Sequence, residues 1–228
     1  MGQADARLWR PPARAAGVTD QIRAAATIIL TRQTQDGPAV LMGQRGAGAA
    51  FMPTKYVFPG GAVDPEDHAA PATGMLARQC AERLAMLCNP DAPRPEALVR
   101  AALREMEEET GLRLAPTPGA PTPAAPTPAA LRFVFRAITP PGRPRRFDAR
   151  FFLMDATALG PGADDFARAS GELSHLHWIG LGPARRLDLP FITEVVLAEV
   201  DALLGGHEQP GVPFFDNSTD VPAFRRIG

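Results

Sequence analysis

The chain has 228 residues, a formal net charge of −1 and 45% hydrophobic residues, enough apolar material for one decorated α/β domain. Because acidic and basic residues nearly cancel, the charge gives no reason to expect a nucleic acid or an anionic membrane as partner. No apolar run approaches the ~18 residues that a membrane-spanning helix needs. The cysteines, Cys80 and Cys88, lack metal-site spacing, so reduced thiols in a cytoplasm are expected.

Apolar runs, hydrophobic periodicity and turn residues predict an alternation of strands and helices. In chain order, the predicted elements are strands Ala24–Thr31, Ala39–Arg45 and Tyr56–Phe58, helices Met75–Leu87 and Glu96–Thr110, strands Leu131–Thr139, Phe147–Met154 and Leu173–Ile179, and helix Pro190–Leu204. This order predicts an α/β/α sandwich with a mixed sheet between helices.

Three segments contain few core-forming residues. Residues 1–20 are rich in Arg and Pro, and we expect a flexible extension. Residues 115–130 repeat Pro-Thr-Pro, which predicts a solvated low-complexity loop. Residues 206–228 are rich in Pro and Gly and are predicted to form a surface strap. The domain itself should therefore span residues 21–205.

The helix predicted over Glu96–Thr110 carries Glu105, Glu108 and Glu109 on one face, apart from its apolar stripe. Like charges at these spacings each cost an exposed helix a few tenths of a kcal/mol. A solvated acidic face is one interpretation. The other is a site for a hard divalent cation such as Mg²⁺, which prefers carboxylate oxygens, with Arg104 holding one carboxylate through its fork.

The wider pattern favours the second interpretation, because Arg104–Leu112 (REMEEETGL) resembles the end of the Nudix box, G-x5-E-x7-R-E-U-x-E-E-x-G-U, where U is aliphatic. Gly111 matches the last glycine of that box, and Phe58–Gly61 (FPGG) resembles the segment that opens it. The resemblance implies a Nudix-type fold and a hydrolase that splits diphosphate linkages.

The chain departs from this pattern in the first half of the box. Thirty-four residues stand between Gly61 and Glu96, where the family usually has five before its first glutamate. Residues 67–95 are therefore interpreted as an insertion. Asp67 occupies the position that an unbroken box would give to the glutamate, whereas Glu96 lies eight positions before Arg104. We prefer Glu96, because it belongs to the same helix as Arg104, and the choice stays open.

The resemblance also assigns roles to individual residues. Glu108 and Glu109 would bind Mg²⁺, for which Mn²⁺ could substitute, and Glu105 would be a further ligand or the base for the attacking water. Arg104 would orient Glu105, and the carbonyl of Gly61, which follows Gly60, could complete the metal shell. Glu172, before a predicted strand, is the candidate for a further catalytic carboxylate from a distant loop.

Substrate identity rests on a finer resemblance. Val40–Asp64 resembles the segment before the box in coenzyme A diphosphatases, and Arg136–Phe152 resembles the subfamily of the peroxisomal acyl-CoA diphosphatase. This implies coenzyme A or acyl-CoA as substrate. The predicted contacts are Arg45, Phe51, Lys55 and Arg146, with Arg143 and Arg145 as further cations for the phosphates.

Two other functions remain open at this stage: a diphosphatase for ADP-ribose, a nucleotide sugar or a dinucleotide, and a Nudix-fold binding module without turnover. Such modules commonly lose box carboxylates, whereas all three are present in this chain. The expected partners are a small-molecule diphosphate and, as in many family members, a second copy in a homodimer, with no nucleic acid and no membrane. The Ala-, Arg- and Pro-rich composition is typical of a bacterial protein, and the chain end does not match a peroxisomal signal.

Overall fold

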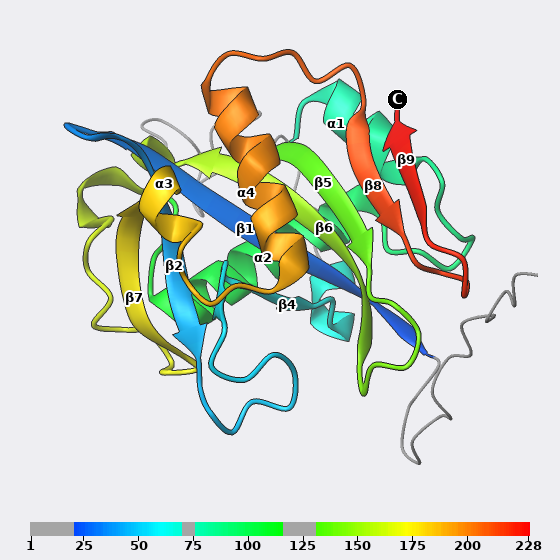
Figure 1. The fold of residues 1–228 in the computed structure, drawn as a ribbon, viewed down its shortest axis with the longest axis horizontal. Helices are drawn as coiled ribbons and strands as arrows, with labels where there is room; N and C mark the ends of the chain where they lie inside the picture. The colour runs from blue at the N-terminus through cyan, green and yellow to red at the C-terminus, as the bar shows by residue number, and fades with distance from the viewer. Residues whose placement is uncertain (1–20, 70–75, 116–130) are drawn as a thin grey trace, which may run out of the picture.

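The computed structural model describes residues 21–69, 76–115 and 131–228, and within them nine strands form one mixed sheet (Figure 1). The strands are β1 (Ile22–Thr34), β2 (Gly37–Arg45), β3 (Tyr56–Val57), β4 (Gly60–Ala62), β5 (Arg132–Ile138), β6 (Arg146–Asp155), β7 (Leu173–Gly180), β8 (Val212–Asp216) and β9 (Ala223–Ile227). Bonded neighbours run in the order β3-β2-β1-β6-β5-β8-β9, while β4 pairs with β1 and β7 with β2. The pairs β1–β6 and β5–β8 are parallel and the others are antiparallel.

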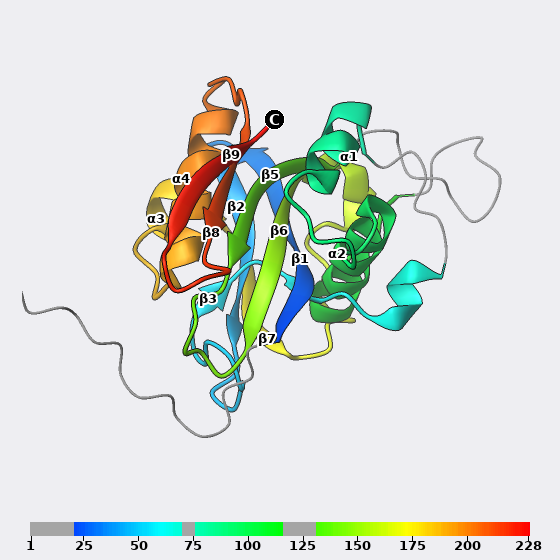
Figure 2. The ribbon, with the colours of Figure 1, turned by 90° about the vertical axis from the view of Figure 1, so that its right-hand side faces the viewer.

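Helices cover both faces of this sheet, as Figure 2 shows. They are α1 (Arg78–Ala85), α2 (Pro95–Thr110), α3 (Leu181–Ala184) and α4 (Phe191–Leu204), accompanied by the short 3-10 helices η1 (Pro65–His68) and η2 (Ala156–Gly162). Helices α1 and α2 lie on one face, and α3 and α4 lie on the other (Figure 2). The predicted α/β/α sandwich with a mixed sheet is confirmed. Within the described ranges, no helix has the length and apolar character needed to cross a membrane.

Strand β1 lies at the centre of the sheet and has no solvated face. Ile28 and Leu30 pack into the apolar core on the α2 side, whereas Ile29 packs into the core on the α4 side. All three side chains are fully buried. A continuous apolar run, rather than an alternating one, is what a strand covered on both faces requires. This strand is the platform on which α2 rests.

Proline and glycine set the bounds of α2. Pro95 stands in its first turn, where a missing N–H costs nothing, and Gly111 ends the helix with φ of 75°. A Cβ at Gly111 would lie 2.9 Å from the carbonyl carbon of Arg168, so glycine also permits close packing there. The predicted stop at Gly111 is confirmed, and the end of α2 is fixed beside the loop that leads to β7.

The helix predicted over Met75–Leu87 is shorter in the structure. Helix α1 spans Arg78–Ala85, and Leu87 has left the helix with φ of 53°. Leu84 is buried, and Leu76 and Cys80 pack at the edge of the same core. The helix therefore packs its apolar residues against the core as expected, but it ends at Ala85, because Met86 adopts an extended backbone conformation.

The C-terminal segment is not a surface strap, contrary to the prediction for residues 206–228. Strand β8 pairs with β5 in parallel, and β9 pairs with β8, so the segment adds two strands to the sheet. Side chains continue the bonding along β5: Gln209 donates to the carbonyl of Val134 at 3.0 Å and Asn217 to that of Ile138 at 2.9 Å. Alternation in such a short strand is too weak a signal to separate it from a Pro/Gly-rich loop.

Three predicted features fall wholly or partly outside the described residues. The extension at residues 1–20 lies outside them, as do residues 116–130 of the low-complexity loop and residues 70–75 of the insertion. The remainder of the insertion, residues 67–69 and 76–95, contributes the end of η1 and all of α1 to the α2 side of the sheet.

Candidate active site

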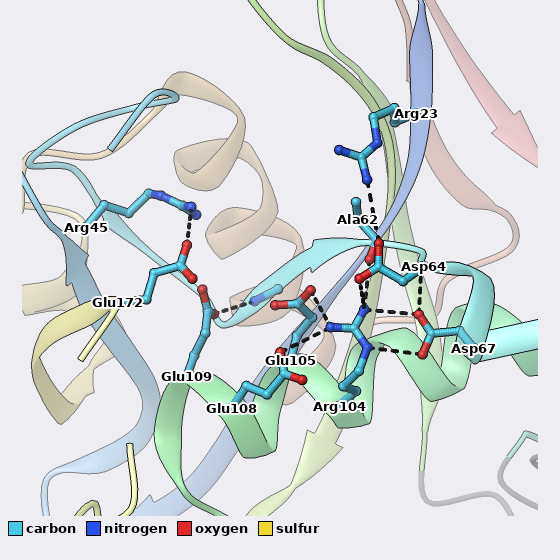
Figure 3. A network of polar contacts seen from close by, with 11 residues as sticks. Arg23, Arg45, Ala62, Asp64, Asp67, Arg104, Glu105, Glu108, Glu109 and Glu172 are labelled. Carbon is cyan, nitrogen blue, oxygen red and sulfur yellow. Dashed lines mark hydrogen bonds and ion pairs between the residues drawn. The ribbon is translucent and has the colours of Figure 1, made fainter. Parts of the chain in front are cut away.

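The last turns of α2 lie against β4, and two glycines bring the backbone of β4 close to the carboxylates (Figure 3). The N–H of Gly60 donates to Oε2 of Glu109 at 2.8 Å. A Cβ at Gly61 would lie 2.2 Å from Oε1 of Glu105, and one at Gly60 would lie 2.6 Å from the carbonyl oxygen of Ala26. A side chain at Gly61 would displace the carboxylate of Glu105, and one at Gly60 would collide with the backbone of β1.

Arg104 is the hub of the polar network in Figure 3. Its Nη1 donates to Glu105 at 2.9 Å and to Glu108 at 3.2 Å, and its Nη2 donates to the carbonyl oxygen of Ala62 at 2.9 Å. Hydrogen bonds to carboxylates, that of Asp67 above all, raise the pKa of Arg104 above its usual value. The guanidinium therefore fixes two carboxylates of the acidic face and ties them to β4.

Asp67, not the preferred Glu96, holds Arg104 in place. Asp67 accepts from Nε of Arg104 at 3.2 Å and from Nη2 at 3.0 Å, and it is only 3% exposed. Glu96 stands in the first turn of α2, about 12 Å along the axis from Arg104 at 1.5 Å per residue. Sharing a helix thus keeps Glu96 away from Arg104, whereas η1 folds Asp67 back onto it.

Glu109 is the most deeply buried carboxylate of the acidic face. It is 1% exposed, and burial raises its pKa to about 8. Its Oε1 has no hydrogen-bond partner among the described residues, although Oε2 is bound by Gly60. Burial also raises the pKa of Glu105, with the charge of Glu108 adding to the effect. A buried oxygen without a partner is costly unless a cation or a proton satisfies it.

Glu172, just before β7, lies with Arg45 on the Glu109 side of the network (Figure 3). Its Oε1 accepts from Nη2 of Arg45 at 2.9 Å, and it lies close enough to add to the raised pKa of both Glu105 and Glu109. Arg45 is at the end of β2, and its buried Nε has no partner in the described part of the chain. The pairing of β2 with β7 is therefore what brings the Arg45–Glu172 pair to α2.

The carboxylates are held apart in this structure rather than gathered at one point. Across residues 21–69, 76–115 and 131–228, no three His, Cys, Asp or Glu side chains converge in the way that a bound metal requires. The protein's own groups hold these oxygens: Arg104 binds Glu105 and Glu108, while Glu172 binds Arg45. The donor set nevertheless suits a hard cation, because it consists of carboxylate oxygens and includes the orphaned Oε1 of Glu109.

Comparison with known proteins identifies the family. No family model matches the chain, and neither does any curated protein sequence. The crystal structure of a Nudix hydrolase from Alicyclobacillus acidocaldarius matches at 30% identity with a TM-score of 0.58, covering 81% of this chain and 92% of that one. The chain belongs to the Nudix hydrolases.

More remote members of the fold group also match. The Nudix domain of Shewanella oneidensis NrtR, in a structure with ADP-ribose, is 14% identical with a TM-score of 0.49, and the match covers 86% of this chain and 94% of that one. A C. elegans Ap4A hydrolase is 18% identical with a TM-score of 0.46, covering 81% of this chain and 99% of that one.

Residues predicted from the Nudix box occupy one region of the hydrolase. Glu105, Glu108 and Glu109 share the face of α2 that meets Gly60 and Gly61. Arg104 contacts two of the three, as its predicted orienting role requires. Asp64 and Arg23 were not predicted. Asp64 lies 3.7 Å from Arg104 and 3.6 Å from Arg23, which extends the network to β1. The signal in the sequence that could have indicated a role for Asp64 is its position close to Gly60 and Gly61.

The predicted substrate residues of this Nudix hydrolase are dispersed. Phe51, in the β2–β3 loop, packs edge-to-face on Phe147 of β6 with ring centroids 5.3 Å apart. Lys55 forms an ion pair with Asp188, so its charge is already compensated. Arg143 and Arg145 are exposed in the β5–β6 connection.

Arg146 was a wrong choice for a substrate contact. Its side chain is 5% exposed and donates to two backbone carbonyl oxygens, that of Thr139 at 3.1 Å and that of Asn217 at 2.6 Å. It ties the β5–β6 connection to the segment after β8. The sequence of a basic loop does not indicate which of its arginines faces inward. The alternation of inward and outward side chains begins only at Arg146, where β6 starts.

Proposed function

We propose that this Nudix hydrolase uses Mg²⁺, with Mn²⁺ as a substitute, to hydrolyse the diphosphate linkage of coenzyme A or acyl-CoA. The observation that carries the metal-dependent reaction is the buried carboxylate of Glu109, which lies on the same helix face as Glu105 and Glu108. Its Oε1 has no hydrogen-bond partner among the described residues. A buried carboxylate without a partner for one oxygen, such as that of Glu109, costs stability unless a cation or a proton is bound.

Glu105, Glu108 and Glu109 would hold the cation together with the carbonyl oxygen of Gly61. A bound divalent cation neutralises diphosphate oxygens, polarises phosphorus and acidifies water. The fit is supported by the oxygen-only donor set and by Gly61, whose lack of a side chain leaves its backbone in contact with Glu105.

The protein's own residues supply orientation and proton transfer. Asp67 fixes the guanidinium of Arg104, and Arg104 in turn fixes the carboxylates of Glu105 and Glu108. Glu172 has a half-exposed carboxylate held by Arg45 and would accept the proton of the attacking water at its free oxygen. Preorganised groups of this kind lower the barrier because they need not reorient during the reaction.

The choice of coenzyme A or acyl-CoA rests on the resemblance of Val40–Asp64 and on the arginines that could bind its phosphates. Coenzyme A carries a 3′-phosphate besides its diphosphate, and Arg143 and Arg145 remain exposed to bind such a group. Arg45 lies at the acidic face itself, and Phe51 with Phe147 offers an apolar surface.

A substrate panel tests this proposal. The full chain with Mg²⁺ would be incubated with coenzyme A, an acyl-CoA, ADP-ribose and a dinucleotide, and the products separated by chromatography. We expect both coenzyme A substrates to give two phosphate-terminated products fastest, and chelation of Mg²⁺ to stop the reaction. Faster cleavage of ADP-ribose or the dinucleotide would overturn the substrate assignment. Binding without turnover of any compound would overturn the reaction itself.

A further inference from the structure

A second unbalanced cluster lies on the α1–α2 side of the sheet, where the segment between these helices crosses β5 and β6. Arg136 of β5 donates to the carbonyl oxygen of Leu87 at 2.8 Å, and Nη2 of Arg150 of β6 lies 3.5 Å from Sγ of Cys88. Both arginines are buried, at 4% and 1% exposure. The two guanidiniums thus fasten this segment to the sheet.

One carboxylate serves both arginines. Asp148 accepts from Nε and Nη2 of Arg136, each at 2.8 Å, and its Oδ2 lies 2.9 Å from Nη1 of Arg150. The next carboxylate, Asp216, forms an ion pair with Arg225 at 3.2 Å. Asp216 also lies close enough to Arg136 to stabilise its charge, whereas Asp148 is the carboxylate that contacts Arg150 in the described residues. Arg150 is therefore the group in this cluster that lacks a further strong acceptor.

The shortfall is located at one edge of Arg150. Its Nη1 is bound by Asp148, but its Nε has no partner in the described residues and its Nη2 faces only the sulfur of Cys88. Nε and Nη2 form an edge of the guanidinium that matches oxygen acceptors in pairs, and sulfur is a weak acceptor. An oxygen attached to Sγ would supply what this edge lacks.

We propose that Cys88 is an oxidation site that takes hydroperoxides, and that Arg150 receives the oxygen of the resulting sulfenic acid. The thiolate sulfur attacks one peroxide oxygen, so an S–O bond forms and the O–O bond breaks. The sulfur loses two electrons, which the peroxide gains, and the departing oxygen takes up a proton to leave as water or an alcohol. Negative charge on Sγ and on the new oxygen lies beside the guanidinium throughout.

The reduced thiol has other acceptors for its hydrogen. Sγ lies 3.1 Å from the carbonyl oxygen of Leu84 and 3.4 Å from that of Met86. Cys80 provides an internal comparison, since it is also half-buried but packs against the apolar core. Any difference in reactivity between the two thiols therefore reports the surroundings of Cys88 rather than simple exposure.

Sulfenic acid trapping tests the proposal on the full chain. The protein would be treated with hydrogen peroxide in the presence of dimedone and digested with trypsin, which cleaves at Arg83 and so places Cys80 and Cys88 on different peptides. We expect Cys88 to be labelled about tenfold faster than Cys80. Equal labelling, or faster labelling of Cys80, would overturn the proposal without any variant.

Variants then test the role of Arg150. Arg150→Met should remove the preference for Cys88, whereas the exposed Arg145→Met, a matched control, should preserve it. If Arg150→Met does not fold, Cys88→Asp and Cys88→Asn replace it, because Asp offers oxygens and a charge to Arg150 while Asn has the same size without the charge. We expect the Asp variant to melt higher than the Asn variant by about 3 °C. An Asp variant that melts no higher would show that Arg150 does not receive an oxygen at this position.

Discussion

The structure contains two clusters of charged side chains with opposite imbalances: an acidic cluster around Glu109 and a basic cluster around Arg150. In the acidic cluster, Arg104 binds Glu105 and Glu108, and the third carboxylate, that of Glu109, has a buried oxygen without a partner among the described residues. Around Arg150, two guanidiniums share Asp148, and a buried nitrogen is left without one. The cation that we propose would satisfy the first cluster, and the oxygen acceptor that we propose would satisfy the second.

The largest effect is expected at the acidic cluster. Glu109→Gln should lower metal-dependent turnover by about 100-fold or more, because it removes a charged oxygen from the metal site. The measurement is kcat with Mg²⁺ for wild type, Glu109→Gln and the control Glu107→Gln. Glu107 lies on the same helix but pairs with Arg113, so its variant should keep near-normal turnover. Full turnover in Glu109→Gln would show that Glu109 does not bind the metal.

Thermal melting distinguishes loss of metal binding from loss of fold. Mg²⁺ in excess over its dissociation constant should raise the Tm of wild type, since a ligand that binds only the folded state stabilises it by about 2.7 kcal/mol at one hundred times Kd. Glu109→Gln should lose this response. Without metal and above pH 8, where Glu109 is ionised, it should melt no lower than wild type, because a neutral amide is less costly to bury than a carboxylate.

The basic cluster should respond in stability rather than in activity. Asp148→Asn leaves two buried arginines without their shared carboxylate, and removing one partner from a buried ion pair costs about 3–5 kcal/mol. Denaturant unfolding would measure this loss against Asp220→Asn, an exposed control. A loss below about 1 kcal/mol would mean that the arginines are not buried as charged groups.

A smaller effect on catalysis separates Asp67 from Glu96. Asp67→Asn should lower kcat by about tenfold or more with little change in KM, because Arg104 loses its anchor while the substrate contacts remain. Asp67→Glu should recover part of the loss, which a purely structural role would not explain. Glu96→Gln should leave kcat unchanged. A loss of kcat in Glu96→Gln but not in Asp67→Asn would show that Glu96 is the first acidic residue of the box.

The smallest effects concern two neighbouring arginines. Arg146→Ala should destabilise the protein without changing the KM for coenzyme A, since its side chain binds only backbone carbonyls in the described residues. Arg145→Ala should leave Tm unchanged and raise KM about fivefold, a little over 1 kcal/mol of binding free energy. A raised KM in Arg146→Ala alone would show that Arg146, and not Arg145, contacts the substrate.

Much of the fold could be predicted because its signals are local. The apolar run of β1, the two glycines of β4 and the Pro95 and Gly111 bounds of α2 each depend on a few adjacent residues. The acidic face of α2 was predictable for the same reason, because helical geometry alone places Glu105, Glu108 and Glu109 together.

What failed depended on contacts distant in the sequence. Asp67 reaches Arg104 only because η1 turns back toward α2, and Arg146 is buried only because the segment after β8 passes over it. The pairing of β8 with β5 likewise cannot be read from five residues that contain a proline. Which segment covers a residue depends on the tertiary structure, so the periodicity of a single segment does not reveal it.

The strands at the C-terminus also bear on how the protein avoids aggregation. Were β8 and β9 absent, β5 would be an open edge whose free N–H and C=O groups could recruit strands from other chains. In the structure β8 covers part of that edge, and the amides of Gln209 and Asn217 occupy carbonyls on either side. The new edge is β9, which carries Arg225 and Arg226, and charged side chains discourage another strand from docking. Shortening the chain before Val212 would therefore be expected to cause self-association even where the active site stays intact.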